Sequence, residues 1–356
     1  MTHNAPVKRQ IFRVSDPEPQ SSGSQFCGST LVGQMGSGAK DRQLSQGSGP
    51  GLGEGFVVLG LFGLWTLFVL VTYSRVPASE LYNVSETGLR GGLSRVLVFL
   101  GWPTALAAIP VLAITLDRLL ASGRNRRTFI GLAVLAFGLC ATIVIPGVVD
   151  EADLDAKASN GLAAAGVMFV AVLAIWAAGT IGTGGATPRT RGDRARVLVG
   201  AVLLLVSLPW VLADLGIFIG DIPPLGHVYR SEQIWTSPEG ETLPSVHFGH
   251  HHGMGGMLLV LTALLLSREL VRMRPTSLRT ALAVYLSLLM AYGIGNIAND
   301  AWYEQVVKRD WTDWAIPNVI RPGFTWMWGL IIVVGTGIFF VLDRDVRGPA
   351  ARVPPF

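Results

Sequence analysis

The sequence predicts an all-α, polytopic integral membrane protein with about eight transmembrane helices, a disordered N-terminal tail and both termini inside. Three observations support this fold class. Half of the 356 residues are hydrophobic and 15% are charged, whereas about a quarter of a soluble domain is charged. Apolar stretches recur from residue 55 onward, and each approaches the roughly 20 residues that cross a bilayer as a helix. Basic residues gather in alternate connecting segments, as the positive-inside rule describes.

The first 54 residues have a different composition from the rest of the chain. They are polar, rich in Gly, Ser and Gln, and have no hydrophobic period, so we expect residues 1–54 to form a disordered cytoplasmic tail. The chain begins without an apolar stretch and cleavage site, so no signal peptide is expected. An alternative is that translation starts downstream of this tail. Residues 55–343 are predicted to form the transmembrane domain, and 344–356 a short cytoplasmic tail.

Eight apolar stretches are candidate spans, each bounded by charged residues or by Gly and Pro. They are 55–73, 95–116, 128–149, 161–181, 197–219, 247–267, 280–299 and 322–342. Four prolines fall within them: Pro103, Pro110, Pro146 and Pro209. A proline removes a backbone donor, so we expect kinks whose freed carbonyls are bonded by neighbouring helices.

The distribution of basic residues predicts the orientation. With the N-terminus inside, the cytoplasmic segments hold 20 of the 28 Lys and Arg residues. This asymmetry places both termini in the cytoplasm. It also explains the net charge of +4 without a nucleic-acid partner, and leaves the lipid bilayer as the main contact. Arg outnumbers Lys 24 to 4 and Ala and Gly are abundant, which favours a GC-rich bacterial source and hence a plasma-membrane location.

Histidines mark one side of this topology. Five of the six lie on the extracytoplasmic side: His227, His247, His250, His251 and His252. The apolar run from Met254 to Leu266 has 13 residues, or about 20 Å of helix, which is too short to cross alone. We therefore expect the sixth span to begin near His247. On such a helix His247, His250, His251 and Met254 share one stripe, and His252 points elsewhere.

This stripe has the residue types and spacing of a metal site. Two imidazoles four residues apart on a helix can bind one ion. Imidazole suits Zn, Cu or Fe, and a thioether from Met254 would favour Cu(I). We therefore predict a bound transition metal or haem, with His227 in the preceding loop as a further ligand. The alternatives are a hydrogen-bonded polar network that responds to pH and an exposed loop without function.

Four glycines interrupt the histidine stretch, and they leave its local structure open. Glycine lowers helix propensity, so this stretch could be a loop. Small residues also let another helix or a flat cofactor approach closely. The glycines are Gly249, Gly253, Gly255 and Gly256.

Two other spans carry polar groups at the same predicted depth. Ionisable side chains within a membrane usually face a bundle interior or a water-filled cavity, so we expect one extracytoplasmic pocket. Beside the histidines, this pocket would contain residues that orient the metal ligands, move protons or position a substrate. These residues are Asp214, Asn296, Asn299, Asp300, Tyr303 and Glu304. Apolar and polar residues then alternate at helical period from Trp302 to Trp314, which favours an amphipathic helix at the outer interface.

Several functions are disfavoured. Two cysteines exclude a disulfide framework and multi-cysteine metal sites. The predicted spans carry no charged residue in their inner halves, so a channel or ion-coupled transporter has no polar path. The stretch His247-Phe-Gly-His-His has the form of one histidine box of the membrane di-iron desaturases, but that family needs several boxes facing the cytoplasm.

Three functions remain open. The first is metal handling or membrane redox chemistry at an extracytoplasmic histidine pocket. The second is a non-catalytic subunit that docks a protein partner through its outer polar face. The third is a metal-dependent membrane hydrolase, with Asp300 as base. The sequence predicts neither a reaction nor whether the protein is an enzyme.

Overall fold

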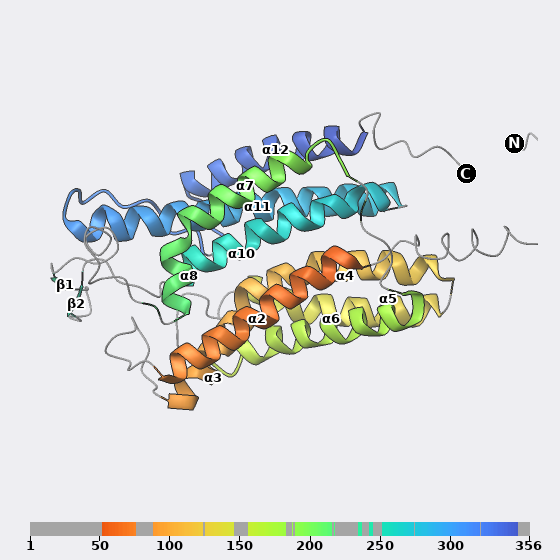
Figure 1. Ribbon diagram of the computed structural model, residues 1–356, viewed down its shortest axis with the longest axis horizontal. Helices are drawn as coiled ribbons and strands as arrows, with labels where there is room; N and C mark the ends of the chain where they lie inside the picture. Colours follow the sequence, from red (N-terminus) through yellow and green to blue (C-terminus); the bar gives the residue numbers. More distant parts are fainter. Residues whose placement is uncertain are drawn as a thin grey trace, which may run out of the picture. The chain divides into compact units, whose positions relative to one another are not determined.

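The computed structural model describes most of the chain beyond the N-terminal segment (Figure 1). The described residues all belong to one compact unit, which spans residues 46–356. They are 52–75, 88–123, 125–145, 156–182, 187, 189–215, 217, 234–236, 242–244, 251–273, 275–320 and 322–347.

The described part is almost entirely helical. Its first half contains α2 (Gly53–Arg75), α3 (Gly88–Phe99), the π-helix η2 (Leu100–Thr104), α4 (Ala105–Ala121), α5 (Arg126–Cys140), the 3-10 helix η3 (Ala141–Val144) and α6 (Asn160–Ile181). Its second half contains α7 (Asp193–Val206), α8 (Leu208–Asp214), α10 (His251–Leu266), η4 (Ser267–Arg272), α11 (Thr276–Gln305), η5 (Val307–Arg309) and α12 (Trp326–Arg347). Two short strands, β1 (Ile234–Thr236) and β2 (Thr242–Pro244), pair in antiparallel fashion.

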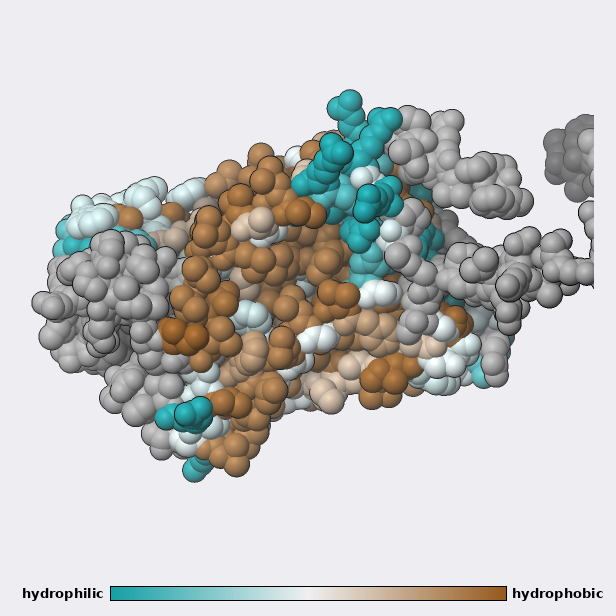
Figure 2. All heavy atoms as spheres, in the orientation of Figure 1, coloured by the Kyte–Doolittle hydropathy of each residue, from teal (hydrophilic) through white to brown (hydrophobic). Residues whose placement is uncertain are grey.

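Seven helical segments of the described chain are long and apolar enough to cross a membrane. They coincide with seven of the eight predicted spans, so the prediction of an all-α, multi-pass membrane protein is confirmed at this level. Many of their apolar side chains are exposed, and Figure 2 shows a broad hydrophobic face with hydrophilic side chains toward both of its ends. A lipid bilayer is the solvent that such a surface requires.

The predicted span 197–219 differs from the other seven. It forms two helices, because α7 ends at Val206 and α8 begins at Leu208. Pro209 has no N–H to bond the carbonyl of Leu205, which breaks the helix here. The 14 residues of α7 give a length of about 21 Å, shorter than a hydrocarbon core of about 30 Å. Helix α8 contacts both α2 and α10. A count of eight spans therefore stays a prediction.

Helices α10 and α11 form the closest pair in the second half. A Cβ atom on Gly256 would lie 2.6 Å from the carbonyl oxygen of Gly293. A Cβ on Gly293 would lie 2.7 Å from the carbonyl oxygen of Gly256. The two backbones therefore approach at a distance that only glycine allows, as at the small-residue interfaces of other membrane helices.

At two prolines the freed carbonyl is bonded by a side chain, and at Pro110 this side chain comes from a neighbouring helix, as predicted. Pro103 cannot bond the carbonyl of Phe99, which instead accepts a hydrogen bond from the Thr104 hydroxyl at 3.0 Å. The other carbonyl, of Leu106, is freed by Pro110. The hydroxyl of Tyr285 on α11 donates to it at 2.8 Å. Pro146 lies outside the described residues.

The prediction of an amphipathic helix from Trp302 to Trp314 is wrong, because the structure has no continuous helix over these residues. Helix α11 continues to Gln305 and is followed by the short η5. Asp310 then adopts a left-handed conformation with φ of 56°, which ends the helical path. The chain turns back, so the indole of Trp302 donates to the carbonyl of Trp314 at 2.9 Å.

The two ends of the helix bundle have different chemistry, and we name them for it. The histidine end is where α10 begins at His251 and where α11 reaches Asp300 and Glu304. The arginine end is where α10 is followed by η4, α4 ends, and α2 and α7 begin. Ion pairs join these elements at the arginine end, including Arg118 with Glu269 and Arg268 with Glu54.

Candidate functional site

A carboxylate from α11 holds the first turn of α10. The backbone N–H of Gly253 donates to Oδ2 of Asp300 at 2.8 Å, and Asp300 is only 2% exposed. The first amides of a helix have no partner within it, and a carboxylate there also interacts favourably with the helix dipole. Asp300 therefore positions the turn that carries the end of the histidine stretch.

Large aromatic rings cover the glycines of this turn. A Cβ on Gly253 would lie 2.5 Å from the indole of Trp210 on α8, and one on Gly255 would lie 2.7 Å from the indole of Trp102. These glycines allow close approach of other elements, one of the two outcomes that the sequence left open. The space beside the turn is filled by protein side chains.

His252 packs into the same cluster. Its ring lies 5.6 Å from that of Trp102 in an edge-to-face arrangement, with an interplanar angle of 83°. The indole of Trp102 donates to the hydroxyl of Tyr292 at 3.2 Å, and this hydroxyl donates to the carbonyl of Ile320 at 2.7 Å. A chain of aromatic contacts thus connects the start of α10 to α11 and to the segment before α12.

Asn296 lies one helical turn before Asp300 on α11. Its Nδ2 donates to the carbonyl of Tyr292 at 2.9 Å. Its Oδ1 is buried and has no hydrogen-bond donor among the described residues. An unsatisfied buried acceptor costs about 1–3 kcal/mol, and such groups in native proteins often mark functional or unoccupied polar sites. Met254 is also fully buried, on the first turn of α10.

The other predicted residues of α11 face different neighbours. Nδ2 of Asn299 donates to the carbonyl of Ile316 at 3.1 Å, so it fixes the segment after η5. Glu304 forms a buried ion pair with Lys308 at 2.9 Å. The ammonium of Lys308 lies 5.4 Å from the ring centre of Tyr303. The residues predicted to share one face of α11 therefore have different roles. Asn296 and Asp300 lie against α10, whereas Asn299, Tyr303 and Glu304 contact residues near the end of α11.

The predicted metal ligands fall largely outside the described residues. His227, His247 and His250 are not among them, and only the backbone of His251 and Asp214 is described. In the part of the chain that is described, no group of three or more His, Cys, Asp or Glu side chains could hold a metal ion. The ligand set thus stays a prediction.

An apolar cavity of about 350 Å³ lies next to the cluster. It is bounded by η2 and α4, η3, α11 and α12, and four aromatic side chains line it: Trp102, Tyr285, Tyr292 and Trp328. The rings of Tyr292 and Trp328 stack at 5.6 Å. Trp102 and Tyr292 belong to both structures, so they separate this cavity from the first turn of α10.

The arginine end contains buried charges that the sequence does not reveal. Arg118 donates to Asp117 at 3.0 Å and to Glu269 at 2.9 Å, and all three are buried. Glu269 also accepts from the hydroxyl of Thr187 at 2.9 Å. The sequence places these residues just beyond predicted spans, where charged flanks are ordinary, and only the packing of α4 against η4 shows that they are buried.

Arg95 is a second buried charge without a sequence signal. It is 1% exposed, and its guanidinium makes no hydrogen bond to the described residues. It lies 5.2 Å from the ring centre of Tyr73 on α2, a distance at which a cation is attracted to an aromatic face. The contact joins α2 to α3.

Asp193 lies at the arginine end, at the start of α7. Partial burial acts to raise the pKa of Asp193, but hydrogen bonds from Thr190 and the charges of Arg268 and Arg196 outweigh it. The pKa of Asp193 is therefore lowered from its ordinary value of 3.8. Its carboxylate stays charged and links α7 to the residues that follow α10.

No protein-family model, curated protein or solved structure matches the chain. The function must therefore be argued from the residues and their geometry.

Proposed function

We propose that the protein is a bacterial plasma-membrane protein that binds a transition metal on the extracytoplasmic side through His247, His250 and His251. Both termini lie in the cytoplasm in this proposal, as the distribution of basic residues predicts. The observation that supports it is the hydrogen bond from the Gly253 amide to Asp300, because it fixes the turn that follows these histidines in the sequence beside a buried carboxylate.

The carboxylate of Asp300 makes this turn more favourable for a cation than a helix N-terminus without a carboxylate would be. A helix N-terminus carries partial positive charge and disfavours a metal ion. The carboxylate of Asp300 supplies a compensating negative charge at the same turn. Groups of this kind, behind the ligands, orient imidazoles and tune the metal. Met254 on the same turn adds a thioether, which favours Cu(I) over harder ions.

A single ion fits the surroundings better than haem. The indoles of Trp210 and Trp102 lie against Gly253 and Gly255. A flat macrocycle would need that same space beside the helix. We therefore infer a mononuclear site of Cu or Zn, with Fe as the third choice.

A second candidate function is membrane redox chemistry with a lipid-soluble partner. The apolar cavity of about 350 Å³ supports it, because Trp102 and Tyr292 line the cavity and also contact each other beside His252. A hydrophobic molecule in this cavity would lie within a few aromatic side chains of the proposed metal.

Metal content of the purified protein tests the proposal. Cu, Zn and Fe are measured by mass spectrometry on protein in detergent, and the metal-free protein is then titrated with Zn²⁺ and Cu⁺. We expect about one tightly bound ion per chain, the ratio of a mononuclear site. Replacing both His247 and His251 with Ala should reduce the metal to background.

Two further variants make the experiment specific. His3→Ala removes a histidine from the N-terminal tail and should leave the metal content unchanged. Asp300→Asn keeps an oxygen that can accept from Gly253 but removes the charge, so metal affinity should fall about 10- to 100-fold. Unchanged metal in the double histidine variant would refute the site. Protein without metal that co-purifies with other subunits would favour the docking-subunit alternative.

A further inference from the structure

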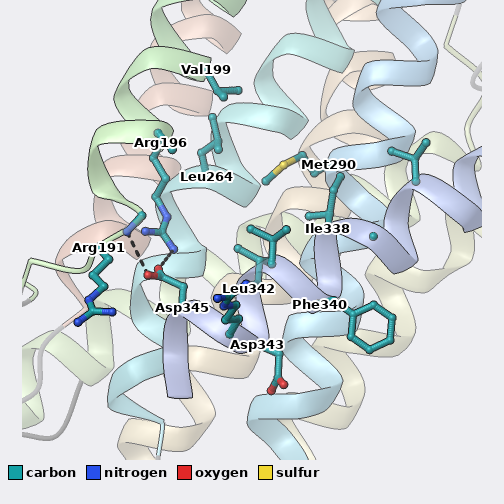
Figure 3. A pocket seen from close by; sticks show the side chains of 16 residues that line it. Arg191, Arg196, Val199, Leu264, Met290, Ile338, Phe340, Leu342, Asp343 and Asp345 are labelled. Atoms are coloured by element: carbon teal, nitrogen blue, oxygen red, sulfur yellow. Dashed lines mark hydrogen bonds and ion pairs between the residues drawn. The ribbon is translucent and has the colours of Figure 1, made fainter. Parts of the chain in front are cut away.

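A large groove lies between α7 and α12 at the arginine end (Figure 3). Its volume is about 1260 Å³. Apolar side chains from four helices line most of it: Val199, Leu264, Met290, Ile338 and Phe340. Charged side chains line one end, where Arg196 forms an ion pair with Asp345 at 2.9 Å. The groove is therefore apolar along its length and polar at one end.

A second groove of about 1120 Å³ lies on the other side of α7, against α10. Leu261, Leu264 and Leu265 of α10 face Val197 and Leu198 of α7 across it. Its charged end has more basic than acidic groups. Five arginines line it and one carboxylate: Arg189, Arg191, Arg194, Arg196, Arg268 and Asp193.

The arginines of the two grooves fall into two classes. Arg196 and Arg268 are held by carboxylates, at 2.9 Å from Asp345 and 3.0 Å from Glu54 respectively. The others are exposed, and they form no ion pair or hydrogen bond within the described residues: Arg189, Arg191, Arg194 and Arg344. Positive charge is therefore available at the mouths of both grooves.

Protein covers little of helix α7. Val197 and Leu205 are each 72% exposed, and Leu203 is the one residue of the described helix that is buried. Its length of about 21 Å exceeds one leaflet of a hydrocarbon core about 30 Å thick. An apolar helix of this length needs apolar neighbours along its whole surface.

We propose that anionic phospholipids occupy the two grooves beside α7. The phosphate binds the arginines at the mouths, with Arg191 shared between the grooves, and the acyl chains run along the apolar walls. Basic pockets between membrane helices on the cytoplasmic side bind anionic headgroups in this way. The combination of exposed guanidiniums and a long apolar lining selects a lipid rather than a free phosphate ion. This inference is independent of the metal site.

Native mass spectrometry of the purified protein tests it. The full chain is titrated with phosphatidylglycerol, with phosphatidylcholine and with inorganic phosphate. We expect phosphatidylglycerol to bind as one or two retained molecules at concentrations where phosphatidylcholine does not. The double variant Arg191→Gln/Arg194→Gln should lower this affinity roughly 10-fold or more, from the charge contribution of two arginines near a membrane surface.

A matched variant controls for net charge. Arg126→Gln/Arg127→Gln removes two exposed arginines from the start of α5, outside both grooves, and should leave lipid binding unchanged. All four arginines are exposed, so both proteins should fold. Equal losses in the two variants, equal binding of both lipids, or binding of inorganic phosphate with the same affinity would each overturn the proposal.

Discussion

The histidine end and the arginine end bury polar groups in different ways. At the arginine end, carboxylates and guanidiniums pair directly, as Arg118 does with Asp117 and Glu269. The histidine end also has a buried ion pair, Glu304 with Lys308, but there the carboxylate of Asp300 bonds a backbone amide and aromatic rings pack against the same turn.

At the arginine end, the buried ion pair of Arg118 with Glu269 joins α4 to η4. The histidine end combines the carboxylate of Asp300 with the unsatisfied Oδ1 of Asn296, beside the first turns of α10, which begins at His251. Buried polar groups held for a purpose other than packing are typical of functional sites.

Removing the central arginine should have the largest effect on stability. Arg118→Met keeps an apolar side chain of similar length but leaves Asp117 and Glu269 buried without this guanidinium. Breaking one side of a buried ion pair costs about 3–5 kcal/mol. Unfolding in mixed detergent micelles, followed by circular dichroism, measures the loss. Arg126→Met, at an exposed arginine near the same end, should change stability by less than about 0.5 kcal/mol. Similar small changes in both would remove the distinction between the two ends.

The second effect concerns the close contact that supports the histidine end. Gly256→Ala places a methyl group 2.6 Å from the carbonyl oxygen of Gly293, so the two helices must separate. Overpacking of this kind costs about 1–3 kcal/mol. Gly63→Ala on α2 meets no atom within 4 Å and should be neutral or slightly stabilising. The same unfolding assay applies, and a neutral Gly256→Ala would show that α10 and α11 are not in close contact.

Between the two ends, a proline and a tyrosine should be energetically coupled. Tyr285→Phe leaves the carbonyl of Leu106 without its donor, at a cost of about 1–3 kcal/mol. With Pro110→Ala, residue 110 regains an N–H that can bond this carbonyl, so the same tyrosine change should then cost little. A double-mutant cycle measures the coupling. Additive effects would mean that the tyrosine does not compensate for the proline.

The smallest expected effect is a dependence on acidic pH at the arginine end. The folded state lowers the pKa of Asp193 below 3.8, so its contribution is present above that value and is lost as pH falls through the folded-state pKa. Thermal unfolding compared between pH 5 and pH 3 should show a smaller loss in Asp193→Asn than in the wild type. Identical losses would show that Asp193 does not contribute.

Much of the fold was predictable from short sequence patterns, namely the apolar stretches and the prolines within them. Stretches of about 20 apolar residues have few alternatives to a membrane-spanning helix, and a proline fixes which carbonyl is freed. The partners of those carbonyls were not predictable, because Tyr285 is distant in sequence from Leu106. Nor was the break at Ser207, since a single proline within a span is usually tolerated.

The candidate site was predictable only in part. The contact of the first turns of α10 with Asp300 and Asn296 follows from the depth of each residue in its span, whereas His247 and His250 lie outside the described residues. The sequence could not show that Asp300 bonds a backbone amide, or that Asn299 turns to Ile316, because both depend on where neighbouring segments pack. The buried pair of Arg118 and Glu269 was missed for the same reason.

X-ray absorption spectroscopy of the metal-loaded protein tests the central claim most directly, because it reports the atoms bound to the metal. The account predicts two or three imidazole nitrogens at about 2.0–2.1 Å for zinc, with a sulfur neighbour for Cu(I) if Met254 takes part. It also predicts that the nitrogen signal disappears when His247 and His251 are both replaced with Ala. A first shell of oxygen atoms alone, or an unchanged nitrogen signal in that variant, would contradict it.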